Sequence, residues 1–186
     1  MVSPWKIKQA ANAILSGGII AYPTEAVYGL GCNPVDTSAV IRLLNLKHRS
    51  MEKGLILVAA DITQLEPFIS MPSEAIRKKI CTTWPGPTTW ILPAKPGVPA
   101  ILTGAHRTLA VRVSAHPLVQ ALCREIDQPL VSTSANRESM PPARSALAVQ
   151  RVFGQKLDYI LHGSVDPQAN PTEIRDALTD QILRSG

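Results

Sequence analysis

The side chains with the clearest potential for chemistry are hydroxyls and cations scattered along a chain of 186 residues. Several of them follow apolar runs that are typical of strands, and ligands gather where the strands of an open α/β sheet end. Hydroxyls and cations that converge there suit a nucleotide and a small carboxylate, bound by positioning and by charge stabilisation. The set comprises Thr24, Lys47, Arg49, Arg112, Ser132, Ser134 and Arg184.

The sequence contains no clear candidate for a catalytic nucleophile or for a set of metal ligands. A Gly-x-Ser-x-Gly elbow and both common phosphate-loop patterns are absent. Cys32, Cys81 and Cys123 are widely spaced and form no Cys-x-x-Cys pair, so we expect no zinc site. Cys32 is interpreted as a small buried hydrophobe.

Composition indicates a globular chain with an aliphatic core. Hydrophobic residues make up 45% and aromatic residues 4%, and the net charge is +5. This charge suits a polyanionic ligand, although a few additional surface lysines would explain it equally well. No apolar run reaches the length of a membrane span, and the odd number of cysteines suits a reducing compartment. We expect one domain over residues 1–186, located in the cytoplasm, with no membrane partner.

The stretch from Ala21 to Cys32 has two interpretations. An apolar run before Pro23 predicts a strand, which Thr24 and Glu25 follow directly. Gly29 and Gly31 permit a positive φ or the close approach of another group to the backbone. The residues of this stretch alone favour an ordinary strand and turn with a glycine-rich connection, and a ligand-binding floor is the alternative.

Periodicity and capping signals predict the elements that would position these residues. Helices are predicted to begin at Ser3-Pro4, Asp36 or Thr37, Asp61, Ser73, His116-Pro117 and Ser145. Strands are predicted at 19–22, 55–58, 88–92, 108–113, 129–131 and 159–161, residues 94–105 are predicted to form a loop, and residues 172–184 are predicted to form a terminal hairpin.

Three polar features within these elements allow more than one role. Lys47 and Arg49 could complement the dipole of the preceding helix, which accounts better for Lys47 than for Arg49. Arg112 interrupts an apolar strand, so it is either paired with a ligand or exposed on an edge strand. Residues 132–136 place three hydroxyls and an amide at a strand end, which favours the binding of phosphate or carboxylate over a simple serine-rich turn.

Six segments together resemble one family, and they occur in the family's order. They read PTEAVYGLG (23–31), KHR (47–49), WPGPTT (84–89), LAVRVSAHP (109–117), STSAN (132–136) and the closing EIRDAL…ILRSG. The chain resembles the YrdC-like threonylcarbamoyl-AMP synthase family in its short bacterial single-domain form. The resemblance implies an α/β (α+β) fold, a twisted mixed sheet flanked by helices with a concave basic ligand cleft.

The resemblance also implies an activity, that of a nucleotidyltransferase. L-threonine, bicarbonate or CO2, and ATP would give threonylcarbamoyladenylate and pyrophosphate, with Mg²⁺ accompanying ATP. The product would serve tRNA threonylcarbamoyladenosine modification, so tRNA would be reached indirectly through a transfer complex, with weak direct RNA binding as a further expectation. The alternative is a non-catalytic RNA-binding maturation factor that uses the basic cleft.

The resemblance assigns roles to particular residues. Lys47 and Arg49 match the pair that holds the ATP phosphates, and they are the expected catalytic residues. The threonine contacts fall on Thr24, Arg112, Ser132 and Thr172, and further ATP contacts fall on Thr108, Ser134 and Arg184. Val58 replaces a histidine of many relatives and Pro142 replaces a serine, so we leave both out of the expected site. Glu25 would either place a metal, fix Thr24 or form a structural salt bridge.

Overall fold

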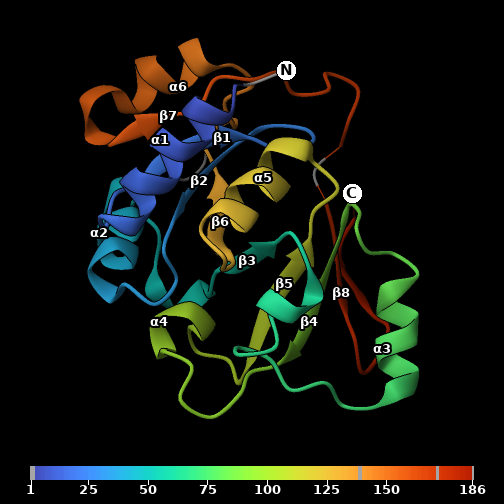
Figure 1. Cartoon of the computed structure of the whole chain (residues 1–186). Coiled ribbons are helices and arrows are strands. Elements are labelled where there is room, and N and C mark those ends of the chain that lie inside the picture. The colour runs from blue at the N-terminus through green and yellow to red at the C-terminus, as the bar shows by residue number, and fades with distance from the viewer. Residues whose placement is uncertain (1–2, 138–139, 171, 186) are drawn as a thin grey trace.

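A mixed sheet organises the part of the chain that the computed structural model describes, namely residues 3–137, 140–170 and 172–185. Nine strands lie in the order β7-β1-β2-β6-β3-β5-β4-β8-β9 (Figure 1). Their bounds are β1 Ile20–Pro23, β2 Tyr28–Cys32, β3 Ile56–Ala59, β4 Thr88–Pro93, β5 Thr108–Val113, β6 Leu130–Ser134, β7 Tyr159–Ile160, β8 Glu173–Asp176 and β9 Ile182–Arg184.

The sheet combines parallel and antiparallel neighbours, as the fold expectation requires. The pairs β1–β7, β3–β5 and β4–β8 are parallel, and the other neighbouring pairs are antiparallel. The expected terminal hairpin is confirmed, because β8 and β9 pair in the antiparallel sense. The prediction of a mixed sheet flanked by helices is therefore confirmed.

Helices cover the sheet unevenly. Figure 1 shows α1, α2 and α6 gathered near β1, whereas α3 stands beside β8. Asp36 caps α2 by accepting from the backbone N–H of Ala39 at 3.0 Å, as the sequence predicts. The helices are α1 Pro4–Leu15, α2 Thr37–Lys47, α3 Glu74–Cys81, α4 Ala100–Thr103, α5 Pro117–Glu125 and α6 Ala146–Phe153, with 3-10 turns at Met51–Lys53, Ile62–Gln64 and Gly154–Lys156.

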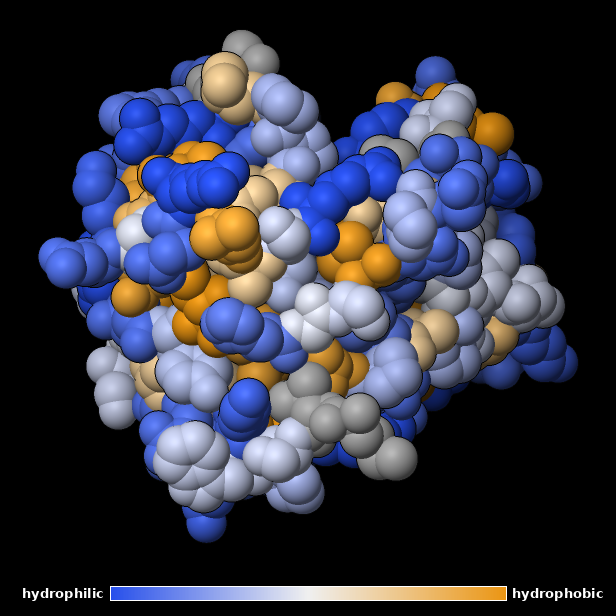
Figure 2. Space-filling view, turned by 90° about the horizontal axis from the view of Figure 1, so that it is seen from above, coloured by the Kyte–Doolittle hydropathy of each residue, from blue (hydrophilic) through white to orange (hydrophobic). Residues whose placement is uncertain are grey.

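The core consists of two apolar clusters, because successive strand residues point to opposite faces of the sheet. Leu57 and Val111 are partners in register and belong to the larger cluster. Val58 belongs to the smaller cluster, which packs against α1 and α5. Seen from above, the surface is largely hydrophilic with small hydrophobic patches, and a notch divides its upper edge (Figure 2).

Four local predictions differ from the structure. The glycine-rich stretch is not a turn, because Gly29 and Gly31 lie inside β2. Pro23 is the last residue of β1 and not a residue that follows it. The loop predicted over 94–105 contains the short helix α4, and the helix predicted at Asp61 is only a 3-10 turn. Propensity under-predicts strands that contain glycine, since tertiary contacts decide such cases.

Candidate functional site

A cavity of about 420 Å³ opens on one face of the sheet. Alternate residues of β3, β5, β4 and β6 form its floor, and the connections between strands form its sides. Its lining includes all of the expected site residues except Lys47, namely Thr24, Arg49, Thr108, Arg112, Ser132, Ser134, Thr172 and Arg184. The structure thus gathers side chains that lie up to 160 positions apart, since the lining runs from Thr24 to Arg184.

One side of the cavity, which we call the buried wall, consists of Thr24, Glu25, Arg112 and Ser132. Arg112 is 4% exposed on β5, which lies between β3 and β4. The alternative of an edge strand with Arg112 facing water is therefore wrong. Its Nη1 pairs with Glu25 Oε2 at 3.0 Å, and this partner offsets the cost of burying a guanidinium.

Glu25 is held from two directions. Besides Arg112, the Ser114 hydroxyl donates to Glu25 Oε1 at 2.7 Å. Burial alone would raise the pKa of Glu25, but Arg112 and the Ser114 hydrogen bond outweigh it and lower that pKa below 4.5. Of the three roles considered for Glu25, the structural salt bridge is the one that these contacts support.

The remaining members of the buried wall are fixed by neighbouring groups. The Thr24 hydroxyl donates to the carbonyl oxygen of Val27 at 2.7 Å, and the Thr24 N–H donates to the same carbonyl at 3.0 Å. Both bonds close the tight connection from β1 to β2. The Ser132 hydroxyl oxygen accepts from the Tyr22 hydroxyl at 2.8 Å. The buried wall is therefore ordered by its own contacts.

A second group of lining residues, which we call the exposed rim, consists of Arg49, Lys53, His106 and Arg184. Arg49 is half-buried and donates to the Gly54 carbonyl at 3.1 Å, whereas Lys53, His106 and Arg184 are exposed. Arg49 follows His48, whose φ of 55° ends α2 in the left-handed region and redirects the chain toward the cavity. The rim supplies positive charge around the opening.

Lys47 lies behind the wall instead of in it. The residue is 4% exposed at the end of α2. Its Nζ donates to the backbone carbonyl of Ser134, to the carbonyl of Asn136 at 2.7 Å and to the Asn136 side chain at 3.2 Å. The structure thus gives Lys47 a supporting place beneath the turn after β6, and its expected contact with phosphate stays a prediction.

Lys53 and His106 line the cavity but were missed by reasoning from the sequence. Lys53 ends the 3-10 turn Met51–Lys53, and His106 lies in the connection from α4 to β5. The available signals for Lys53 were its nearness to Lys47 and Arg49 and its place in the stretch 53–58, where Val58 replaces the histidine of many relatives. Val58 and Pro142, which we left out, also line the cavity. Val58 is the partner of Arg112 in register, so an apolar side chain stands beside the guanidinium.

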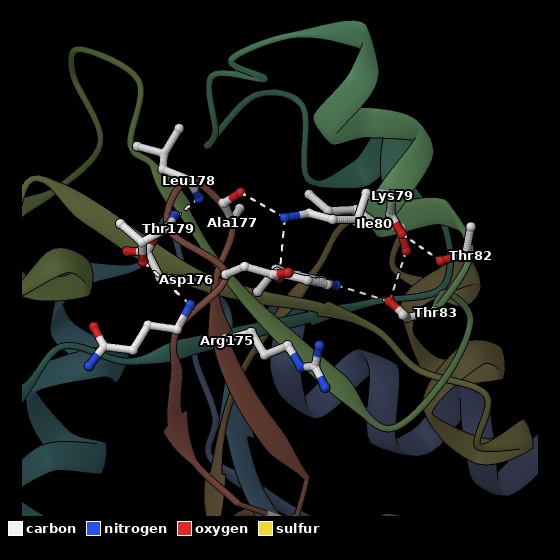
Figure 3. A network of polar contacts seen from close by, with 12 residues as sticks. Lys79, Ile80, Thr82, Thr83, Arg175, Asp176, Ala177, Leu178 and Thr179 are labelled. Atoms are coloured by element: carbon white, nitrogen blue, oxygen red, sulfur yellow. Dashed lines mark hydrogen bonds and ion pairs between the residues drawn. The ribbon is translucent and has the colours of Figure 1, made fainter.

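A network of polar contacts anchors the hairpin that carries Thr172 and Arg184. Lys79 on α3 donates to the Ala177 carbonyl at 3.2 Å (Figure 3). The same ammonium pairs with Asp180 at 3.2 Å. Its ammonium lies 5.1 Å from the ring centroid of Trp90 on β4. Within the hairpin, Arg184 Nη2 donates to the Thr172 carbonyl at 2.6 Å. These contacts connect α3, β4 and the hairpin into one side of the cavity.

Such a site defines a class of protein: an α/β fold with an open cavity on its sheet that is lined by hydroxyls and cations. The family model Sua5_yciO_yrdC, described as Telomere recombination, matches residues 12–186. The chain belongs to this Sua5/YciO/YrdC family, which confirms the resemblance found from its motifs.

Curated relatives are similar over nearly their whole length. The chain is 52% identical over 180 residues to a threonylcarbamoyl-AMP synthase of Nitrosococcus oceani, covering 97% of each chain. It is 48% identical over 186 residues to that of Pseudomonas syringae pv. syringae, covering 100% of each. These relatives support the expected enzyme and not the alternative of a non-catalytic RNA-binding factor.

Solved structures with the same fold extend the comparison. The structure of P. abyssi Sua5 complexed with L-threonine superposes with a TM-score of 0.91 at 35% identity, covering 99% of this chain. The chain spans 55% of that longer protein. E. coli YciO superposes with a TM-score of 0.85 at 29% identity, covering 99% of this chain and 90% of its own.

Across the described ranges, no helix is long and apolar enough to cross a membrane.

Proposed function

We infer that the chain is an enzyme, a threonylcarbamoyl-AMP synthase of the nucleotidyltransferase type. It converts L-threonine, bicarbonate or CO2, and ATP into threonylcarbamoyladenylate and pyrophosphate. The observation that carries this conclusion is the make-up of the cavity lining, which combines a buried, paired guanidinium with a rim of cations. A small carboxylate and a triphosphate need these two environments.

The buried wall is the proposed threonine subsite. Arg112 binds the α-carboxylate, because a guanidinium offers parallel donors that match a carboxylate. Thr24, Ser132 and Thr172 contribute hydroxyls to the other polar atoms of threonine. This assignment is supported by the common position of these residues in the cavity and by the L-threonine named for P. abyssi Sua5.

The exposed rim is the proposed nucleotide subsite. Arg49 and Arg184 face the phosphates, and Thr108 and Ser134 add hydroxyls from β5 and β6. We add Lys53 to this set on the basis of its place in the lining. Lys47 is the proposed support of the Ser134 turn, and any direct contact of Lys47 with phosphate would need a change of its present partners.

Magnesium is proposed to enter with ATP. Glu25 is the acidic side chain in the described lining, and it is already bonded to Arg112 and Ser114. The described residues contain no group of three or more His, Cys, Asp or Glu side chains that could hold a metal ion. The residues present therefore fit an ion carried by the triphosphate oxygens, which would neutralise part of their charge.

The chemistry consists of two steps. The threonine amine attacks the carbon of bicarbonate with loss of water, or the carbon of CO2 with loss of a proton from nitrogen, and gives a carbamate. A carbamate oxygen then attacks the α-phosphorus. The bond from the α-phosphorus to the bridging oxygen breaks, and pyrophosphate leaves with the electron pair. Cations of the rim stabilise the charge on the leaving group, while the buried wall holds the carbamate in line. A side-chain nucleophile is not needed for either step.

The reaction would take place in the cytoplasm, and its product would be the substrate of a later transfer reaction. A mixed anhydride of a carbamate and AMP is reactive, so a transferase must consume it, and tRNA is the proposed final acceptor. Direct binding of RNA by this chain is a weaker expectation that rests on the net charge of +5.

Release of pyrophosphate by the purified protein tests the proposed function. We expect release from ATP and Mg²⁺ only when threonine and bicarbonate are both present. Leaving out either compound should abolish the signal, and Arg112→Ala should abolish it with all compounds present. Pyrophosphate release that is independent of threonine, or no release under any condition, would contradict the proposal.

A further inference from the structure

Four residues on three neighbouring strands lie in two adjacent rows beside the buried wall. Tyr22 on β1 is the partner of Gly29 on β2, and Gly31 on β2 is the partner of Ser132 on β6. Tyr22 is fully buried, yet its hydroxyl donates to the Ser132 hydroxyl oxygen at 2.8 Å. A side chain of β1 therefore reaches across β2 to a cavity residue of β6.

The two glycines of β2 make this crossing possible. A Cβ on Gly31 would lie 2.6 Å from the Val131 carbonyl oxygen and 2.8 Å from Tyr22 Cε1, and a Cβ on Gly29 would lie 3.3 Å from Tyr22 Cζ. Neither glycine has a positive φ, so conformational freedom is not the reason for their presence. A bare strand surface is required because the tyrosine ring occupies the space where side chains would otherwise stand.

The contact determines how the Ser132 hydroxyl can act. A serine hydroxyl has one proton and two acceptor lone pairs. Tyr22 donates to one lone pair, and because burial raises the pKa of Tyr22, its phenol stays protonated and remains a donor. Ser132 lines the cavity, so its own proton can be given to a ligand there.

We propose that Tyr22 is a positioning residue for the synthase reaction: it orients Ser132 as a donor to an anionic carboxylate or carbamate oxygen of the threonine substrate. The proposal rests on the proposed function, but Tyr22 itself lies outside the expected site. It also gives Gly29 and Gly31 a definite role, since they form the track along which the Tyr22 ring reaches Ser132.

A purely structural role makes a different prediction. Tyr22 belongs to the smaller apolar cluster with α1 and α5, so its ring contributes to stability in any case. Tyr22→Phe keeps the ring and removes only the hydroxyl. If Tyr22 is only structural, this change lowers stability and leaves threonine affinity as it was.

The test measures threonine binding and catalysis separately. Isothermal titration gives the Kd for threonine, and pyrophosphate release gives the KM for threonine and for ATP. Loss of one hydrogen bond of about 1 kcal/mol corresponds to roughly fivefold, so Tyr22→Phe should raise the threonine Kd and KM by about that factor. The KM for ATP should be unchanged. Tyr159→Phe on the edge strand β7 is the matched control and should behave as the wild type.

A double variant identifies the route of the effect. Tyr22 acts through Ser132, so Tyr22→Phe combined with Ser132→Ala should bind threonine no more weakly than Ser132→Ala alone. Wild-type threonine affinity in a folded Tyr22→Phe protein, or additive effects in the double variant, would overturn the inference.

The measurements distinguish failure of the positioning role from failure of the proposed function. If the wild type binds threonine with the predicted dependence on Tyr22 and Ser132 but releases no pyrophosphate, the positioning role stands and the proposed reaction fails. If pyrophosphate release depends on threonine but Tyr22→Phe is indistinguishable from the wild type, the proposed reaction stands and the positioning role fails. If the wild type does not bind threonine, both fail.

Discussion

The buried wall and the exposed rim meet in one cavity but are built in opposite ways. Along the wall, Thr24, Arg112 and Ser132 are buried, and each is bonded to another part of the chain. Along the rim, Lys53, His106 and Arg184 are exposed. The wall is a buried polar cluster, whereas most of the rim is exposed to solvent, although Arg49 and Arg184 also donate to backbone carbonyls.

The difference shows how one fold can treat two ligands differently. A small amino acid has few atoms, so its recognition depends on donors and acceptors that are already in place. A triphosphate carries several charges, so exposed cations can attract it through water without a fixed geometry. We therefore expect the wall to determine selectivity and stability, and the rim to determine the electrostatic part of nucleotide affinity.

The largest expected difference between the two regions is in stability. Arg112→Ala leaves the Glu25 carboxylate largely buried without its guanidinium, which we expect to cost about 3–5 kcal/mol. Arg184→Ala removes an exposed cation and should cost less than about 1 kcal/mol. Urea unfolding of both variants measures the free energies, and equal losses would contradict the division into wall and rim.

The next prediction concerns Lys47, whose ammonium holds the turn after β6 through the carbonyls of Ser134 and Asn136. Lys47→Met keeps the length of the side chain but leaves the carbonyls of Ser134 and Asn136 without their donor. We expect a loss of about 2–3 kcal/mol in the free energy of unfolding and weaker binding of both ligands, since Ser132 and Ser134 share β6.

The outcome for Lys47 separates support from phosphate contact. Unfolding in urea and titration with ATP and threonine are the measurements. Weaker ATP binding alone, with unchanged stability and unchanged threonine affinity, would contradict the supporting role. That result would favour the direct phosphate contact that the sequence predicts.

Salt should affect the two ligands unequally. Raising sodium chloride from about 50 to 500 mM shortens the screening length severalfold, which weakens attraction between exposed charges. We expect the Kd for ATP to rise about fivefold to tenfold and the Kd for threonine to change less than about twofold. Lys53→Ala should flatten the salt dependence for ATP. Equal salt dependence for both ligands would show that the wall is as accessible to solvent as the rim.

The smallest expected effect is the acid dependence caused by Glu25. Its pKa in the folded protein lies below 4.5, so its stabilising contribution is complete above that pH. The contribution is lost as the pH falls through the lowered pKa, because the folded state then binds the proton. The difference in unfolding free energy between the wild type and Glu25→Gln should therefore be constant from pH 7 to 5 and shrink in stronger acid. A difference that stays constant down to pH 3 would contradict the pairing with Arg112.

The sequence predicts most of the residues that line the cavity but not the order of the strands that carry them. Arg112 was predicted within a strand, and the hydroxyls of residues 132–136 were predicted at a strand end. Whether β5 is central or at an edge depends on strand order, which local patterns do not encode. The edge alternative for Arg112 therefore remained open until the fold settled it.

Glycines and lysines show why other parts could not be predicted. Gly29 and Gly31 are bare because the Tyr22 ring crosses them, a contact between strands that periodicity cannot show. The sequence correctly predicts the helix that ends at Lys47, but the burial of Lys47 depends on where the turn after β6 packs. Lys53 ends a short 3-10 turn and His106 lies in a connection, and sequence patterns are weak in such segments.

The most direct test of the account is a crossed titration of two variants with two ligands. Threonine and ATP are titrated into the wild type, Arg112→Ala and Lys53→Ala at low salt, after unfolding curves have shown that each variant is folded. We predict that Arg112→Ala loses threonine binding and keeps most ATP binding, whereas Lys53→Ala weakens ATP binding and keeps the threonine Kd. A loss of both ligands in either variant to the same degree would contradict the division of the cavity into a threonine wall and a nucleotide rim.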